Sequence, residues 1–364
     1  MKAVRPFIKD DIPQVVHMFR RLLLGDDQGR RLLSPAELPE YFEQIFFHNP
    51  WYDEEIPSLV YQSGEGKIIG FLGVAPRPMM LRSRPIRMAI SFHLMVEPES
   101  RNSLAGVQLL KSFFSGPQDL SITDGAGEVG RKVWEGVGGT TAFLYSQRWI
   151  RILRPSQFVI DRLGRRMAYP RAVQALSPLC NLTDAAAAKF LPDFFPKLTS
   201  RCTEEDLDAD TLLTHLPHFT MTRALQPVYD DFSLQWVLKH AEQMAFYGSL
   251  KKVLVRDQHG NVIGWYLYYL KAGKTSTVLQ LAARRNTFNE ILDHLFDHAR
   301  RHGATSLIGR LEPQYIQELS DKYCCFNRFG SWTLIHSNNS ELLHVIQRGD
   351  AFLTGLEGEW CLLF

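Results

Sequence analysis

The sequence lacks the features that would place it in an oxidising compartment, in a membrane or on a nucleic acid. Its five cysteines are odd in number and form no CxxC pair of the kind that builds a zinc site, so we interpret them as reduced thiols. No run approaches the roughly 20 apolar residues that a membrane span needs, and no apolar signal segment opens the chain. Lys plus Arg number 41 and Asp plus Glu number 39, a balance that demands neither a nucleic acid nor an anionic membrane as partner. We therefore expect a cytoplasmic protein without a membrane span.

What the sequence contains is material for two domains. Its 364 residues exceed the roughly 100 to 150 residues of an ordinary domain, and 45% apolar with 22% charged residues is a globular composition. An internal repeat is present, because Leu59–Leu72 (LVYQSGEGKIIGFL) aligns without a gap to Val253–Tyr266 (VLVRDQHGNVIGWY). Each segment reads as an apolar run, a polar turn with glycine and a second apolar run, which predicts a β-hairpin.

A second match follows each hairpin. Arg101–Leu104 and Arg285–Phe288 each open an amphipathic helix, with Ser103 and Thr287 at the position of an N-cap. The order of helix, hairpin, strand, Arg-Asn-hydroxyl, helix and strand occurs twice, so we predict a duplication. The expected fold is mixed α/β, with two tandem domains that each form a mixed, mostly antiparallel sheet flanked by helices.

The segment between the two copies sets the expected domain boundaries. We assign residues 1–155 to the first domain, residues 156–195 to an arginine-rich, partly helical connector and residues 196–364 to the second domain. Seven arginines against one acid lie between Arg148 and Arg171, and guanidinium groups bind phosphates well. No known nucleic-acid motif accompanies them, so we expect a solvated connector and no nucleic-acid partner.

The strand, loop and helix after the first hairpin resemble those of the GNAT N-acetyltransferase superfamily. In that family a strand leads into a loop of the pattern Gln/Arg-x-x-Gly-x-Gly/Ala, whose backbone amides hold the CoA pyrophosphate at a helix N-terminus. Here the strand ends at Met95 and Val96. The matching loop consists of Arg101, Asn102, Ser103, Leu104, Ala105 and Gly106.

This resemblance implies two GNAT-like domains, with acetyl-CoA or another acyl-CoA bound in the first by Met95, Val96 and the loop. Leu104 stands where the family usually has its first glycine. The corresponding loop of the second copy has no glycine and carries Glu290. We therefore expect the second domain to be structural or to form one wall of the substrate site.

The same strand supplies candidates for the base that an amine acceptor needs. His93 lies on the strand and has an ordinary pKa near 6.5, and Glu97 lies at its end. A structural histidine and a solvated carboxylate are the plain alternatives. Where the family has the tyrosine that protonates the CoA thiolate, this chain has Trp134, whose indole N–H is a poor acid.

Three more polar residues follow later strands. Asp124, Tyr145 and Ser146 lie where the family separates two strands to admit the acyl chain. We expect them to line the substrate cleft together with Trp134, and ordinary polarity at strand ends is the alternative. His294, His298 and His302 recur every four residues on one predicted helix, but they flank its apolar stripe. We interpret them as a solvated face and expect no metal.

The function implied by this resemblance is an acyl-CoA-dependent N-acyltransferase, with acetyl as the expected acyl group. The acceptor would be the amine of an aminosugar or of a small metabolite, in a cleft between the copies. Two alternatives stay open: a GNAT-like binding or scaffold protein without turnover, and a peptidyl-type transferase that uses aminoacyl-tRNA. Leu104 and Trp134 are the residues that favour the binding protein.

Overall fold

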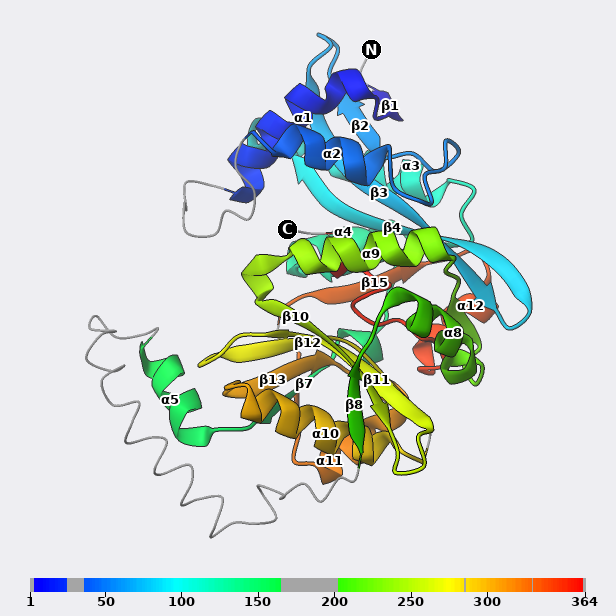
Figure 1. The fold of residues 1–364 in the computed structure, drawn as a ribbon. Coiled ribbons are helices and arrows are strands. Elements are labelled where there is room, and N and C mark those ends of the chain that lie inside the picture. Colours follow the sequence, from blue (N-terminus) through cyan, green and yellow to red (C-terminus); the bar gives the residue numbers. More distant parts are fainter. Residues whose placement is uncertain (1–2, 25–35, 165–201, 285, 329, 363–364) are drawn as a thin grey trace. The chain divides into compact units, whose positions relative to one another are not determined.

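The computed structural model describes residues 3–24, 36–164, 202–284, 286–328 and 330–362, and for residues 24, 101–103, 163 and 164 it describes the backbone alone. The chain forms two compact units. The first unit combines Met1–Ser146, Thr220–Phe246 and Gly330–Phe364, and the second combines Gln147–Phe219 and Tyr247–Phe329. Each unit contains one sheet flanked by helices (Figure 1), so the mixed α/β fold with two mostly antiparallel sheets is confirmed.

The sheet of the first unit has the strand order β1-β2-β3-β4-β5-β15-β6, and β9 pairs with β3. All of its pairs are antiparallel except β4 with β5. The strands are β1 (Ala3–Pro6), β2 (Leu59–Gln62), β3 (Ile68–Leu81), β4 (Arg84–Val96), β5 (Leu120–Ala126), β6 (Thr140–Thr141), β9 (Leu225–Pro227) and β15 (Trp332–His336). The helices are α1 (Ile12–Phe19), α2 (Leu38–Phe46), α3 (Ala105–Phe114), α4 (Glu128–Gly136), α9 (Asp231–Gln243) and α12 (Ser340–Gln347).

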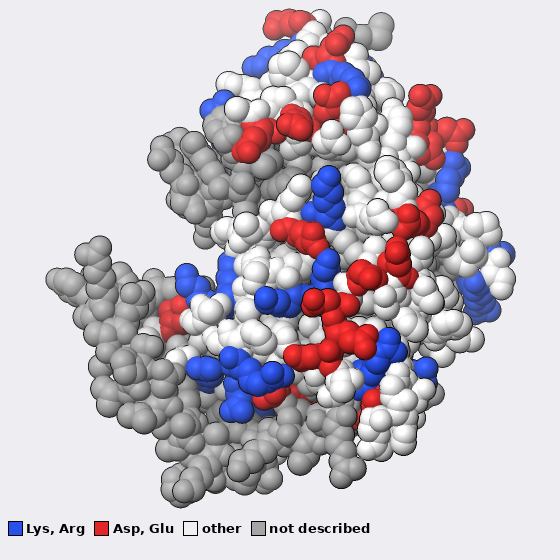
Figure 2. Space-filling view, in the orientation of Figure 1, with Lys and Arg blue, Asp and Glu red and all other residues white. Residues whose placement is uncertain are grey.

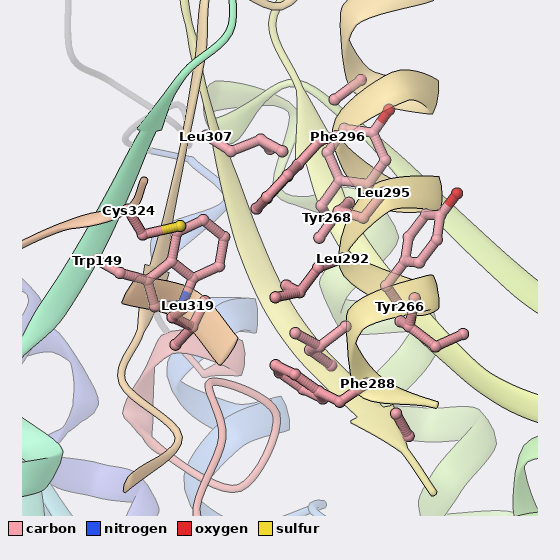
Figure 3. Packing of buried hydrophobic residues seen from close by; sticks show 14 of the residues in the cluster. Trp149, Tyr266, Tyr268, Phe288, Leu292, Leu295, Phe296, Leu307, Leu319 and Cys324 are labelled. Carbon is pink, nitrogen blue, oxygen red and sulfur yellow. The ribbon is translucent and has the colours of Figure 1, made fainter. Parts of the chain in front are cut away.

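The sheet of the second unit has the order β14-β7-β13-β12-β11-β10-β8. Its strands are β7 (Arg148–Ile152), β8 (Thr203–Asp206), β10 (Ser249–Arg256), β11 (Val262–Leu270), β12 (Thr275–Ala283), β13 (Ser306–Arg310) and β14 (Cys325–Asn327). Its helices are α5 (Pro155–Gly164), α8 (Ala209–Thr220), α10 (Phe288–Arg301) and α11 (Ile316–Asp321). Side chains from α10, β11 and β7 form the core (Figure 3), where the rings of Phe288 and Tyr315 stack with centroids 3.5 Å apart.

The predicted hairpins are present, and they agree in detail. Both turns place a glycine in the left-handed region, at φ +84° for Gly66 and +82° for Gly260, a conformation that favours glycine. The ladder of β2 with β3 shifts register after Tyr61, and the ladder of β10 with β11 shifts after Val255. These two residues hold equivalent positions in the repeat, so the hairpins share their bulge as well as their sequence pattern.

The helix that follows each hairpin packs over an equivalent glycine. A Cβ on Gly70 would lie 3.1 Å from Leu109 of α3, and a Cβ on Gly264 would lie 2.9 Å from Ile291 of α10. A close helix approach therefore requires glycine at both positions. Ser103 is not the N-cap of α3, because the chain makes a short 3-10 helix over Pro98–Ser103 and α3 starts after Leu104.

The two units interleave along the chain. The sequence pattern instead predicts two consecutive domains, residues 1–155 and 196–364. Strand β7 belongs to the second unit, where it pairs with β13 and β14. Strand β15 belongs to the first unit and pairs with β5 and β6. Such pairing joins segments about 160 to 210 residues apart, which no local pattern encodes. Of the predicted connector, the part up to residue 164 lies in α5, and residues 165–195 lie outside the described residues.

The near balance of 41 basic and 39 acidic residues is visible on the surface. On the face drawn in Figure 2, basic side chains lie beside acidic ones. Within the described ranges, each helix is too short or too polar to cross a membrane.

Candidate functional site

The candidate site lies in the first unit, where β4 and β5 separate. The two parallel strands pair only at Met88–Ile90 with Leu120–Ile122. Beyond Ile90, β4 continues to Val96, and no pairing of that part with β5 is found among the described residues. Over this stretch β4 has no described strand partner on the side of β5, so backbone groups on that side are candidates to bond a ligand.

A bulge turns β4 at this point. Phe71 of β3 pairs with Met95 and Gly73 pairs with Phe92, so β4 has one more residue than β3 between the two pairs. His93 takes up the extra length in a left-handed conformation, with φ +53°. A bulge redirects a strand and its side chains, and it is common next to active sites. The sequence predicts His93 as a strand residue but gives no sign of this conformation.

The His93 ring contacts Phe19, Tyr41 and Phe92, with centroids 4.9 Å from both phenylalanines. Tyr41 Oη donates to the Leu362 carbonyl at 2.8 Å and lies 3.1 Å from His93 Nε2. Because the hydroxyl has a single hydrogen, we assign the proton of the ring to Nε2, which leaves the lone pair on Nδ1. Burial lowers the pKa of His93 to about 3, so the ring is neutral at physiological pH.

Glu97, the second predicted base, closes the strand. Its backbone N–H donates to the Ile69 carbonyl at 2.9 Å, and its side chain is buried. The carboxylate forms an ion pair with Arg21, which lies in the π-helical turn Arg20–Leu24. Glu97 is thus a held carboxylate at the end of β4, rather than a solvated one.

The loop and the start of α3 follow directly. Of Arg101, Asn102 and Ser103 the structure describes the backbone alone, within the 3-10 helix. Leu104 caps α3 in the left-handed region, at φ +58° and ψ +15°, and its side chain is 60% exposed. This backbone conformation gives a physical reason for the glycine that the family usually has here.

The first turn of α3 lies close to the end of β4. Ala105 is fully buried, and a Cβ on Gly106 would lie 3.4 Å from Val96 Cγ2. The first turn contains no acidic residue, and no described side chain caps the helix. Met95 is buried in the sheet, one residue before Val96. A helix start of this kind presents N–H groups and a partial positive charge to an anion.

Asp124 lies on β5, across from the separated part of β4. It contacts the segment at residues 358–361, which the sequence does not mark as part of the site. Its Oδ1 accepts from the Glu359 N–H at 2.9 Å, and a Cβ on Gly358 would lie only 2.0 Å from its Oδ2. The 3-10 helix Glu359–Cys361 contacts both β4 and β5. A contact between residues 235 positions apart leaves no local pattern in the sequence.

Trp134, which the sequence predicts in the substrate cleft, is a buried core residue. Its ring is 2% exposed, packs edge-on against Phe114 with centroids 4.7 Å apart, and donates from Nε1 to the Ile335 carbonyl at 3.2 Å. Trp134 belongs to the hydrophobic core under α3 and α4. It therefore takes the space of a core residue, and its one donor already has an acceptor.

Tyr145 and Ser146 are also buried, in a 3-10 turn over Leu144–Ser146 where the sequence predicts the end of a strand. Tyr145 Oη donates to the Ala351 carbonyl at 2.7 Å and accepts from the Ala351 N–H at 3.0 Å. Ser146 Oγ donates to the Ala142 carbonyl at 2.9 Å and accepts from the Thr333 N–H at 3.0 Å. Both hydroxyls bond backbone groups of neighbouring segments.

Of the three histidines predicted to form a solvated face, His302 is exposed, but the two on α10 are not. His294 and His298 are each only 6% exposed. Their Nδ1 atoms lie 2.9 Å from Tyr266 Oη and 2.8 Å from Tyr268 Oη. The two tyrosines of β11 supply polar partners that make burial of the rings possible. Within the described residues, no group of three or more His, Cys, Asp or Glu side chains is placed to hold a metal ion.

Among solved structures, the chain is similar to three acyltransferase structures. A probable N-acyltransferase from Enterococcus faecalis V583 matches with a TM-score of 0.60 and 11% identity, over 93% of this chain and 73% of that one. A GCN5-related N-acetyltransferase from Anabaena variabilis matches with a TM-score of 0.55 and 10% identity, over 93% and 74%. N-myristoyltransferase from Saccharomyces cerevisiae, with bound myristoyl-CoA and inhibitors, matches with a TM-score of 0.51 and 12% identity, over 92% and 79%.

No family model matches the sequence, and no curated protein matches it. Identities of 10 to 12% establish a common fold and nothing finer. The fold of this chain is the GNAT N-acyltransferase fold.

Proposed function

We propose that the chain is an acyl-CoA-dependent N-acyltransferase that transfers an acetyl group to the amine of an aminosugar or another small metabolite. The observation that carries this proposal is the separation of β4 from β5 directly beside the start of α3. The side of β4 toward β5 suits a thioester arm, and the uncapped first turn of α3 suits its phosphates.

The donor would be held by residues of one continuous segment. Met95 and Val96 supply backbone groups on that side of β4, and the loop from Arg101 to Gly106 supplies backbone amides and the small residues that let phosphate approach. Gly106 leaves the first turn uncrowded, since its nearest neighbour beyond the loop is Val96. The fit depends on backbone groups, so it tolerates leucine at position 104.

In the transfer, the amine nitrogen forms a bond to the thioester carbonyl carbon, the C–S bond breaks, and the amine loses a proton. His93 Nδ1 accepts a hydrogen bond from the neutral amine, with Tyr41 fixing the ring through Nε2, and the proton that the amine loses passes to the carboxylate of Glu97. A pKa of about 3 makes the ring a hydrogen-bond acceptor that orients a neutral amine, more than a group that stores the proton. Glu97 lies at the end of the same strand, where Arg21 holds it in an ion pair, and we propose its carboxylate as the base for the amine.

The thiolate of CoA would leave without a protein acid from the position of Trp134, because that indole is buried and bonded to Ile335. The same observation favours a second candidate, a GNAT-like protein that binds an acyl-CoA without turnover. The two candidates agree on donor binding and differ on chemistry, so one pair of measurements separates them.

The test combines thermal unfolding with an assay for free CoA thiol. Acetyl-CoA at 100 times its dissociation constant should stabilise the protein by about 2.7 kcal/mol, and an amine panel of aminosugars and small metabolites should release CoA. His93→Gln should lower the rate of release with little effect on the thermal shift. A shift without release from any amine would favour the binding protein. Absence of a shift with every acyl-CoA tried would contradict both candidates.

A further inference from the structure

Arg77, on β3, is a buried cation that forms no ion pair with any carboxylate among the residues that the structure describes. It is 4% exposed. Its Nη2 donates to Cys361 Sγ at 3.0 Å, while its Nε and Nη1 have no hydrogen-bond acceptor among the described residues. No carboxylate of the described chain forms an ion pair with it. A buried charge without a partner is costly, so an arginine in this state favours the binding of an anionic ligand.

Glu357, a buried acid whose carboxylate feels the charge of Arg77, is bonded to other groups. Glu357 Oε1 accepts from Tyr229 Oη at 3.0 Å, and Oε2 accepts from the Thr354 N–H at 2.9 Å and from its hydroxyl. Burial raises the pKa of Glu357, which weakens it further as a counter-charge. The thiol of Cys361 is no substitute, because burial raises its pKa to about 11 and it stays neutral.

The guanidinium packs against Trp51, which belongs to a group of aromatic side chains. Its carbon lies 4.0 Å from the centroid of the Trp51 ring, a cation–π contact. The Trp51 ring lies 5.9 Å from that of Tyr229 and 6.5 Å from that of Trp236. All three aromatic residues are half-buried and thus partly open to solvent. They form an accessible rim above a cation whose free N–H groups are buried.

This cluster is close to the candidate site. Arg77 pairs with Met88, two residues along the strand from the pair of Ala75 with Ile90, where β4 and β5 separate. Two residues of a strand span roughly 7 Å. Cys361, which accepts from Arg77, is followed by Leu362, whose carbonyl accepts from Tyr41.

We propose that Arg77, with Trp51 against it and Trp236 near the Trp51 ring, binds an oxyanion, a carboxylate or a phosphate, on the acceptor amine. The proposal rests on the proposed transfer function for the word acceptor, and it narrows the substrate class to amines that carry a negative group within about 10 Å of the nitrogen. The guanidinium supplies charged donors to the oxyanion, and the aromatic rim contacts the body of the molecule.

The test uses pairs of amines that differ only in the anionic group. The pairs are 4-(aminomethyl)benzoate with 4-(aminomethyl)benzamide, and glucosamine 6-phosphate with glucosamine; affinity is measured by calorimetric titration of the full chain. At least one charged member should bind about tenfold more tightly than its neutral partner, and which pair shows the preference identifies carboxylate or phosphate. Arg77→Met should bring that ratio close to one, and Arg77→Lys should keep part of it.

Arg84→Met is the matched control, because it removes the same charge from an exposed position on the adjacent strand; its ratio should equal that of the wild type. If Arg77→Met does not fold, competition in the wild type decides: inorganic phosphate or acetate should weaken binding of the charged amine and leave the neutral one unchanged. Equal affinities within each pair, or a preference that Arg77→Met retains, would overturn the proposal.

Binding and turnover keep this inference apart from the proposed function. A charge preference that depends on Arg77 without CoA release would support the anion site and contradict the transferase. CoA release from charged and neutral amines alike, with unchanged acetyl-CoA binding, would support the transferase and contradict the anion site.

Discussion

The two copies of the hairpin and its helix have the same register and the same bulge, yet their helices begin differently. The first turn of α3 contains no acid and places Gly106 against Val96. The first turn of α10 contains Glu290, and its N-cap hydroxyl, Thr287 Oγ1, donates to the Ile263 carbonyl at 3.0 Å. The helix dipole thus acts without an opposing acid at the first helix start, whereas Glu290 adds a negative charge at the second. A shared backbone therefore does not imply a shared site.

The cores beneath the two helices differ as well. Leu72 and Val74 of β3 lie in an apolar cluster. Tyr266 and Tyr268, at the equivalent positions of β11, form hydrogen bonds with histidines of α10. The same packing geometry thus accepts either apolar contacts or paired polar groups, provided that each buried polar atom has a partner.

The largest effect is expected from adding a methyl group beneath each helix. A Cβ on Gly264 would lie 2.4 Å from the Ala282 carbonyl oxygen, which the sheet holds in place, whereas a Cβ on Gly70 would meet the end of the flexible Leu109 side chain at 3.1 Å. Gly264→Ala should lower the apparent free energy of unfolding by about 3 kcal/mol and Gly70→Ala by about 1 kcal/mol. Urea denaturation of both variants measures the difference, and equal losses would contradict the packing described.

The tyrosine–histidine pairs should make the second unit sensitive to acid. Burial lowers the pKa of His298 to about 4 and also lowers that of His294. A histidine with a depressed pKa stabilises the fold fully above its unfolded pKa near 6.5, and that stability is lost as the pH falls toward 4. The pKa of His298 alone falls from 6.5 to about 4, so we expect a loss of about 2 to 3 kcal/mol over this range.

A double replacement checks the source of that loss. Tyr268→Phe with His298→Leu removes both partners of one pair, which should be nearly neutral at pH 8 and should reduce the loss between pH 6.5 and 4. Thermal unfolding across this pH range provides the measurement. An unchanged pH dependence would show that other groups are responsible.

The smallest effect concerns the backbone at the start of α3. Leu104 has φ +58° and an exposed side chain, so it contributes left-handed strain and little packing. Leu104→Gly should stabilise the protein by about 0.5 to 1 kcal/mol and should leave acetyl-CoA binding intact. Thr287→Gly at the start of α10, where φ is −115°, should not stabilise. A gain at both positions would indicate a general effect of glycine rather than relief of strain at Leu104.

Local patterns were sufficient for much of the fold. The hairpin turns at Gly66 and Gly260 and the apolar stripe of α10 follow from residues close in sequence. The pairing of β7 with β13 and of β15 with β5 does not follow from local patterns, because the paired strands are far apart along the chain.

The candidate site likewise combines residues that are close in sequence with residues from distant segments. The segment from His93 to Gly106 is continuous, so sequence and structure agree on which residues adjoin one another there. Tyr41 and the segment at Glu359 reach it from distant parts of the chain, and no pattern marks them. The roles of His93, Glu97 and the loop residues stay predictions. Trp134 shows the limit of a family position, because a large ring there is taken up by the core.

Calorimetric titration of acetyl-CoA into each of two matched variants tests directly whether the start of α3 binds the donor. Gly106→Glu and Asn289→Glu place the same charge at the second residue of α3 and of α10, where a helix tolerates it well. Gly106→Glu should weaken acetyl-CoA binding at least about tenfold, and Asn289→Glu should bind as the wild type does. Wild-type affinity in Gly106→Glu, or equal weakening in both variants, would contradict the account.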